Sequence, residues 1–164
     1  LAATTLSGVL TGYGLELIPV HMFLLYFATM SAITPPVALA SYAAAGIAEA
    51  SPNKVGWQGL VLVLPSFLVP FVFIFSHELL LMGSPVSIAL AVISASAGIF
   101  AFSIITEGWV FGKVPMALRV LLGGAVICLL TVGTVTDLIG YAILAVVLIH
   151  NYWTCRRKRP EGTA

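Results

Sequence analysis

The chain has 164 residues, of which 60% are hydrophobic and only 8% are charged, and its formal net charge is +1. Soluble domains carry about 25% charged residues, so this chain has too few charges to cover a water-facing surface. Together with a mean hydropathy of +1.12, the composition excludes an ordinary soluble domain and predicts an integral membrane protein. Cys128 and Cys155 have no metal-ligand spacing and are expected to be free thiols.

Apolar segments alternate with short polar breaks along the chain, without the strict alternation of barrel strands, so we expect an all-α integral membrane fold. The expected segments are 1–13, 18–50, 55–75, 85–106, 115–133 and 138–153, followed by a basic tail at 154–164. The chain begins at Leu1 inside an apolar stretch, with no charged leader region, so we expect it to be the C-terminal portion of a longer protein.

The first two segments do not have the length of a single span. Residues 1–13 reach about 20 Å, which suits a half-membrane element or a truncated helix, whereas 18–50 would reach about 50 Å against a hydrocarbon core of about 30 Å. Thr34-Pro35-Pro36 interrupts this second segment, and we expect Thr34 to cap a second half-helix that has the prolines in its first turn. The prediction is half a re-entrant hairpin, one Pro-broken helix and then four transmembrane helices.

The positive charges predict an orientation. If the C-terminal tail is cytoplasmic, counting back through the helices places all seven Lys and Arg residues on the cytoplasmic side. The three Trp residues then fall at the inner interface, where aromatic residues gather in membrane proteins. The same count places the Pro-Pro break near the middle of the bilayer.

A break at that depth leaves carbonyl oxygens without partners, which is tolerated where they are buried in protein or line a cavity. Secondary transporters use such breaks to bind Na⁺, and Ser31, Thr34 and Pro35 supply hydroxyl and carbonyl oxygens here. The residues alone leave open a proline kink that binds nothing. Ser41 and Tyr42 follow the break, and either contact a substrate or serve in packing.

Other polar residues favour Na⁺ over proton coupling. The acidic residues all fall near loops, so no intramembrane carboxylate of the kind used in proton relays is seen. His21, His77 and His150 are expected near the interfaces, and Gly123-Gly124 is expected to mark close helix packing. The Arg156–Arg159 cluster is explained as a topology signal, with anionic lipid binding as an alternative.

The stretches HMFLLYFATMSAITPPVALASYAAAGIAEASPNKVGWQG (21–59) and VPFVFIFSHELLL (69–81) resemble the large membrane subunit of tripartite ATP-independent periplasmic (TRAP) transporters. The resemblance is greatest to the fused permeases, in which the small and large membrane subunits form one chain. It is close over about 15–82 and looser over 83–153. It implies that 1–82 belongs to the transport domain, 83–153 forms an additional three-helix region and 154–164 is a cytoplasmic tail.

The resemblance implies an elevator-type secondary transporter in the bacterial inner membrane, with Na⁺ as coupling ion and no cofactor. Its implied partners are a small organic anion, expected to be a carboxylate, and the periplasmic binding protein that delivers it; membrane lipid surrounds it and no nucleic acid is expected. The hairpin tip would lie before Leu1 or near Thr4, Thr5 and Ser7. The alternatives are a non-catalytic membrane scaffold and an intramembrane enzyme, although no buried Ser–His or Asp pair supports the enzyme.

Overall fold

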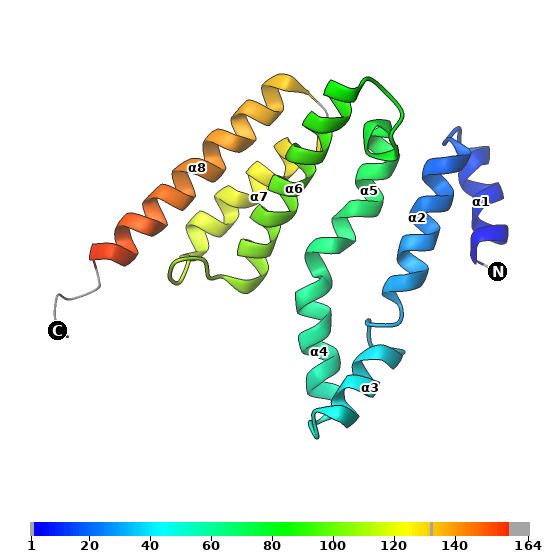
Figure 1. Cartoon of the computed structure of the whole chain (residues 1–164), viewed down its shortest axis with the longest axis horizontal. Helices are drawn as coiled ribbons and strands as arrows, with labels where there is room; N and C mark the ends of the chain where they lie inside the picture. The colour runs from blue at the N-terminus through cyan, green and yellow to red at the C-terminus, as the bar shows by residue number, and fades with distance from the viewer. Residues whose placement is uncertain (1, 132, 158–164) are drawn as a thin grey trace. The chain divides into compact units, whose positions relative to one another are not determined.

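The computed structural model describes residues 2–131 and 133–157, which form helices joined by turns, with one isolated β-bridge between Trp109 and Lys113. The predicted all-α class is thus confirmed for the described residues. In chain order, with η for a 3-10 helix, the elements are α1 (Ala2–Gly12), α2 (Leu17–Met30), α3 (Leu39–Ile47), α4 (Pro52–Val63), η1 (Leu64–Phe67), α5 (Leu68–Phe75), η2 (His77–Leu80), α6 (Pro85–Glu107), α7 (Met116–Leu130) and α8 (Thr134–Arg157) (Figure 1).

Among the described residues, three helical stretches are long and apolar enough to cross a membrane: Pro52–Phe75, Pro85–Glu107 and Val135–Arg156. They correspond to three of the four spans predicted after the broken helix. The predicted span 115–133 is shorter than expected, because α7 has 15 residues and the backbone is extended at Thr131. The last helix is longer than expected and includes the first residues of the predicted tail, because neither Thr nor Arg prevents a helix from continuing.

The chain divides into two compact units between Val92 and Ile93. In the first unit α1 packs on α2, α2 on α5 and α3 on α4. Aromatic rings fill the contact of α2 with η1 and α5: the ring centroid of Phe27 lies 5.6 Å from that of Phe67 and 5.9 Å from that of Phe71. This packing holds α2 beside the span that follows the broken helix.

In the second unit α7 packs on α8, with Leu122 and Val147 fully buried. The predicted close packing at Gly123-Gly124 is wrong within the described residues, because a Cβ atom added at either glycine would meet nothing within 4 Å. Close contact occurs instead at Gly140, where an added Cβ would lie 2.5 Å from Cγ of Leu129. Cys128 and Cys155 are free, as predicted.

A polar network links α6 to α8 inside the second unit. The Ser94 hydroxyl donates to Oδ2 of Asp137 at 3.0 Å, and its oxygen lies 3.0 Å from the hydroxyl of Tyr141. Ser94 has one proton to give, so the Tyr141 hydroxyl donates to Ser94 in turn. Oδ1 of Asp137 is buried and has no hydrogen-bond partner among the described residues.

Candidate functional site

The interruption of the second apolar segment extends over residues 31–38, between the end of α2 and the start of α3 (Figure 1). It is therefore wider than the predicted Thr34-Pro35-Pro36. The predicted capping role of Thr34 is wrong, because its Oγ1 donates back to the carbonyl oxygen of Met30 at 2.8 Å. The residue that precedes α3 is Ala38, so the prolines lie in the turns before the new helix and not in its first turn.

The two prolines explain why regular helix stops here. The amide of Pro35 would have bonded the carbonyl of Ser31, and that of Pro36 the carbonyl of Ala32, but proline has no N–H. The Ala32 carbonyl instead accepts from the amide of Ala40 at 2.9 Å. Within the described part of the chain, the carbonyl oxygens of Ser31 and Pro35 accept no hydrogen bond, so the break presents free backbone acceptors.

Side-chain hydroxyls add oxygens at the same place. The Ser31 hydroxyl donates to the carbonyl of Ala28 at 2.6 Å, and the Thr34 hydroxyl donates to Met30 as described above. Each proton points back along the helix, so the lone pairs of each oxygen stay free for a ligand. Ser31, Thr34 and Pro35 thus combine hydroxyl and carbonyl oxygens, the donor atoms that hard cations prefer.

Ser41 and Tyr42, the predicted substrate contacts, are hydrogen-bonded to the break itself. The buried Ser41 hydroxyl donates to the carbonyl of Ile33, and the Tyr42 hydroxyl donates to the carbonyl of Pro36, both at 3.3 Å. Two carbonyls of the break are thereby satisfied by side chains of the next helix. Sequence reasoning missed this role, although both residues lie within two turns after the prolines.

Helix α4 approaches the break through two glycines. A Cβ atom at Gly56 would lie 3.2 Å from Cε1 of Tyr42 and 3.5 Å from Cγ of Pro35. At Gly59 it would lie 3.1 Å from Oγ of Ser41. The missing side chains therefore let the helix axis pass close to the break, a use of small residues that is common between membrane helices.

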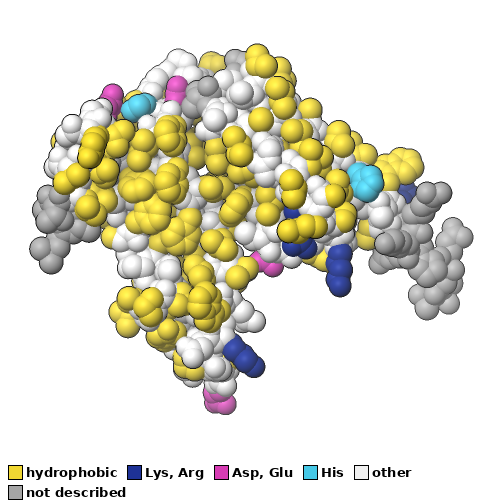
Figure 2. Space-filling view, turned by 180° about the vertical axis from the view of Figure 1, so that it is seen from behind, with side chains coloured by type: hydrophobic (Ala, Val, Ile, Leu, Met, Phe, Trp, Pro, Cys, Tyr) yellow, Lys and Arg dark blue, Asp and Glu magenta, His cyan; other side chains and the backbone are white. Residues whose placement is uncertain are grey.

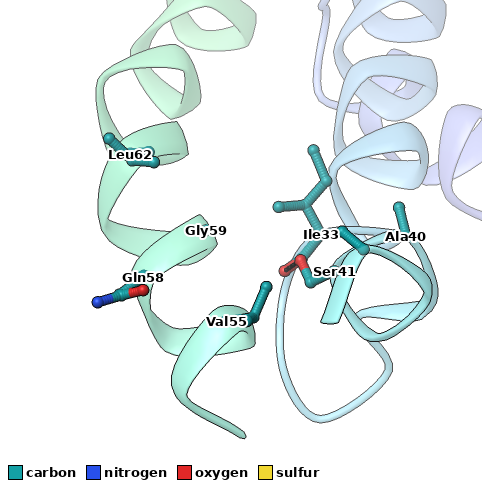
Figure 3. A pocket seen from close by; sticks show the side chains of 8 residues that line it. Ile33, Ala40, Ser41, Val55, Gln58, Gly59 and Leu62 are labelled. Atoms are coloured by element: carbon teal, nitrogen blue, oxygen red, sulfur yellow. Dashed lines mark hydrogen bonds between the residues drawn. The ribbon is translucent and has the colours of Figure 1, made fainter. Parts of the chain in front are cut away.

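An open cavity of about 370 Å³ lies between α3 and α4, next to the break. Figure 3 shows the Ser41 hydroxyl facing the space between the two helices. Ser41 lines this cavity and Tyr42 does not. The lining is otherwise almost entirely apolar, and it comprises Ile33, Ala40, Ser41, Ala44, Val55, Gln58, Gly59 and Leu62.

Ala38 connects the break to α3 with a left-handed backbone, at φ 38° and ψ 38°. Its side chain is fully buried. A left-handed conformation costs an alanine about 1–2 kcal/mol relative to the right-handed one, and such strain is characteristic of functional sites. The surrounding contacts must hold this residue in place.

The remaining predicted polar residues lie away from the break. Nδ1 of His21 lies 2.8 Å from the carbonyl oxygen of Leu17, and Nε2 of His77 lies 3.4 Å from a carboxylate oxygen of Glu16. Ser7 is buried in α1, whereas the side chains of Thr4 and Thr5 lie outside those that the structure describes. Among described residues, no group of three His, Cys, Asp or Glu side chains is placed to hold a metal ion.

Glu78 lies in the turn that follows the span Pro52–Phe75. Hydrogen bonding with the backbone at Glu78, followed by the Ser76 hydroxyl at 2.8 Å, lowers the pKa of this carboxyl. The carboxylate is therefore favoured in the folded state.

Comparison with known proteins supplies the family. Residues 1–88 match the model of the family described as "Tripartite ATP-independent periplasmic transporter, DctM component". No curated protein and no solved structure gave a significant match. The match covers more than half of the chain and includes α1, the whole break and the span Pro52–Phe75. This family is a membrane permease component and not an enzyme, so the alternative of an intramembrane enzyme is rejected. The chain belongs to the DctM component family of the tripartite ATP-independent periplasmic transporters.

Proposed function

We propose that this chain forms part of a Na⁺-coupled permease that imports a small organic carboxylate delivered by a periplasmic binding protein. The observation that carries the proposal is the break at 31–38, where carbonyl and hydroxyl oxygens gather between two half-helices. Helix α2 has 14 residues and α3 has nine. At about 1.5 Å per residue the two total about 35 Å, enough for a split helix to cross a bilayer.

The proposed coupling-ion site consists of Ser31, Thr34 and Pro35. Thr34 offers its hydroxyl oxygen and Pro35 offers its free carbonyl oxygen. Ser31 offers a hydroxyl oxygen and a free carbonyl oxygen. A Na⁺ ion would replace the donor that Pro35 no longer gives to the Ser31 carbonyl, and it would satisfy carbonyls that are costly to leave unpaired in a membrane. Ser41 and Tyr42 are proposed to border the substrate path, with the Ser41 hydroxyl at the cavity wall.

The proposed domain organisation is that of a fused-type permease. Residues 1–82 contribute a re-entrant arm, the broken helix and the following span to a transport domain that moves as a rigid body. Residues 83–153 form the additional membrane region of a fused-type permease, and 154–164 form a tail on the cytoplasmic side. The positive charges support this orientation of the C-terminus, and the family supports a bacterial inner-membrane location.

The test is Na⁺-dependent uptake by proteoliposomes that contain the full-length protein, with its binding protein in the external buffer. Thr34→Ala should raise the Na⁺ concentration for half-maximal uptake about tenfold, the effect of losing one ligand of a charged group. Thr34→Ser should restore most of the affinity. Thr29→Ala is the matched control, because the Thr29 hydroxyl bonds back to Tyr26 in the same way but lies inside regular helix.

Pro35→Ala tests the carbonyls without removing any side-chain oxygen. It restores an N–H that can bond the Ser31 carbonyl and extend α2, so Na⁺ dependence should weaken more than in Thr34→Ala. If both variants retain the Na⁺ dependence of Thr29→Ala, the proposed cation site is wrong. A non-catalytic scaffold remains the rival function, and it would predict no uptake by the unmodified full-length protein.

A further inference from the structure

The loop between α6 and α7, residues 108–115, is held in one conformation by side chains of the neighbouring helices. The Asn151 side chain accepts from the amide of Phe111 at 3.3 Å and lies 3.5 Å from the carbonyl of Lys113, to which it donates. The Cys155 thiol donates to the carbonyl of Phe111 at 2.9 Å. The loop is thus attached to the last turns of α8, in the same compact unit.

Arg119 fixes the other side of this loop. Its Nε donates to the carbonyl of Val114 at 3.1 Å, and Nη2 donates to the carbonyl of Gly108 at 3.4 Å. Gly108 has φ +67°, and an added Cβ would collide with the guanidinium group, so only glycine fits here. Two of the five guanidinium donors are used and the others remain for a ligand.

Within residues 2–131 and 133–157, no carboxylate neutralises the positive charge of Arg119. Arg119 is only partly exposed, and no carboxylate among the described residues forms an ion pair with it. Glu107 is near in sequence but is exposed and forms no ion pair in the part of the chain that the structure describes. A partly buried, uncompensated cation at a membrane surface calls for an external anion.

Exposed aromatic and basic side chains also occur in the loop and in the last turns of α8. Trp109 and Trp153 are 60% and 71% exposed. Lys113 and Arg156 are also exposed. Figure 2 shows Lys and Arg side chains among hydrophobic ones on one face of the molecule. Exposed Trp is favourable at a lipid interface, where the ring lies among headgroups and its N–H stays polar.

We propose that the loop 108–115, with Arg119, binds the phosphate headgroup of an anionic phospholipid. The guanidinium and Lys113 supply the positive charge, and Trp109 of the loop lies against the glycerol and upper acyl region. A soluble anion does not explain the exposed tryptophan of the loop, whereas a lipid explains both the charge and the apolar surface. The site is independent of the proposed cation site, which lies in the other compact unit.

Native mass spectrometry of the detergent-solubilised full-length protein provides the test, with phosphatidylglycerol and phosphatidylcholine of identical chains as probes. We expect phosphatidylglycerol to bind more tightly. Lys113→Gln and Arg119→Gln should each lower this preference about fivefold at low salt, the effect of one charge near an anionic lipid. The matched control is Lys54→Gln, which removes another exposed Lys, from α4.

The variants also separate a lipid site in the loop from simple attraction to the basic tail. The Lys113 side chain makes no hydrogen bond within the described residues, so Lys113→Gln tests charge even if Arg119→Gln disturbs the loop. A variant with Arg157, Lys158 and Arg159 changed to Gln should keep most of the preference. Equal binding of the two lipids, or a preference lost only in the tail variant, would overturn the proposal.

Discussion

The contact of α4 with the break leads to a sharp prediction for Gly56→Ala. The added methyl would lie 3.2 Å from Cε1 of Tyr42 and 3.5 Å from Cγ of Pro35, whereas carbon atoms pack best at about 3.5–4.0 Å. Tyr42 must therefore move by a few tenths of an ångström. Its hydrogen bond to the Pro36 carbonyl is already long at 3.3 Å, so this movement should break it.

The magnitude follows from two opposing effects. Overpacking costs about 1–3 kcal/mol, and replacing glycine by alanine inside a helix returns about 0.5–1 kcal/mol. Gly56→Ala should therefore destabilise the protein by about 1 kcal/mol. Gly46→Ala is the matched control, because an added Cβ at this α3 glycine meets nothing within 4 Å, so only the favourable helix effect applies.

Thermal unfolding of the purified full-length protein measures this difference. The melting temperature should fall for Gly56→Ala and stay the same or rise for Gly46→Ala. Na⁺-dependent uptake should be impaired in Gly56→Ala and not in Gly46→Ala. Gly56→Ala should need a higher Na⁺ concentration for half-maximal uptake, because the carbonyls of the break move with Tyr42 and Pro35. Equal shifts of the melting temperature in the two variants would refute the contact between α4 and the break.

Three further predictions concern single residues. Ala38→Gly should be neutral or stabilising, because relief of about 1–2 kcal/mol of left-handed strain offsets the lost methyl, whereas Ala45→Gly in regular helix should lower the melting temperature. Ser94→Ala should cost about 1–3 kcal/mol in unfolding measurements, because the partly buried Asp137 carboxylate loses its donor; a loss no larger than for a surface serine would contradict this. The lowered pKa of Glu78 means that its carboxylate stabilises the folded state. This stability is fully present above the ordinary pKa of 4.5 and is lost as the pH falls through the lowered pKa. The difference in melting temperature between the unmodified protein and Glu78→Gln should therefore be constant at neutral pH and shrink in acid.

The positions of the helices could be predicted from the sequence, whereas their ends could not. Hydrophobic length fixes where a segment can cross a bilayer, and the third and fourth segments match the structure closely. It does not determine where a helix stops, because that depends on local backbone bonding. Thus α7 ends at Leu130 before its apolar run does, and α8 continues to Arg157 beyond its apolar run.

The candidate site was only partly predictable for a related reason. Adjacent prolines predict a break, since each removes one amide donor from the helix. The width of the break depends on which groups bond its carbonyls, and here they come from the following helix: the amide of Ala40 and the hydroxyls of Ser41 and Tyr42. Such partners are set by three-dimensional packing, including two glycines of α4 that no local pattern connects to the prolines.

This arrangement separates the carbonyls of the break into two groups with different roles. The carbonyls of Ala32, Ile33 and Pro36 are satisfied by α3, which holds the backbone between the half-helices in a fixed path. Those of Ser31, Pro35 and Val37 are left without a partner within the described chain. In the proposed cation site this division would be useful, because the satisfied carbonyls would resist collapse of the break when an ion leaves, while those of Ser31 and Pro35 are the proposed ligands.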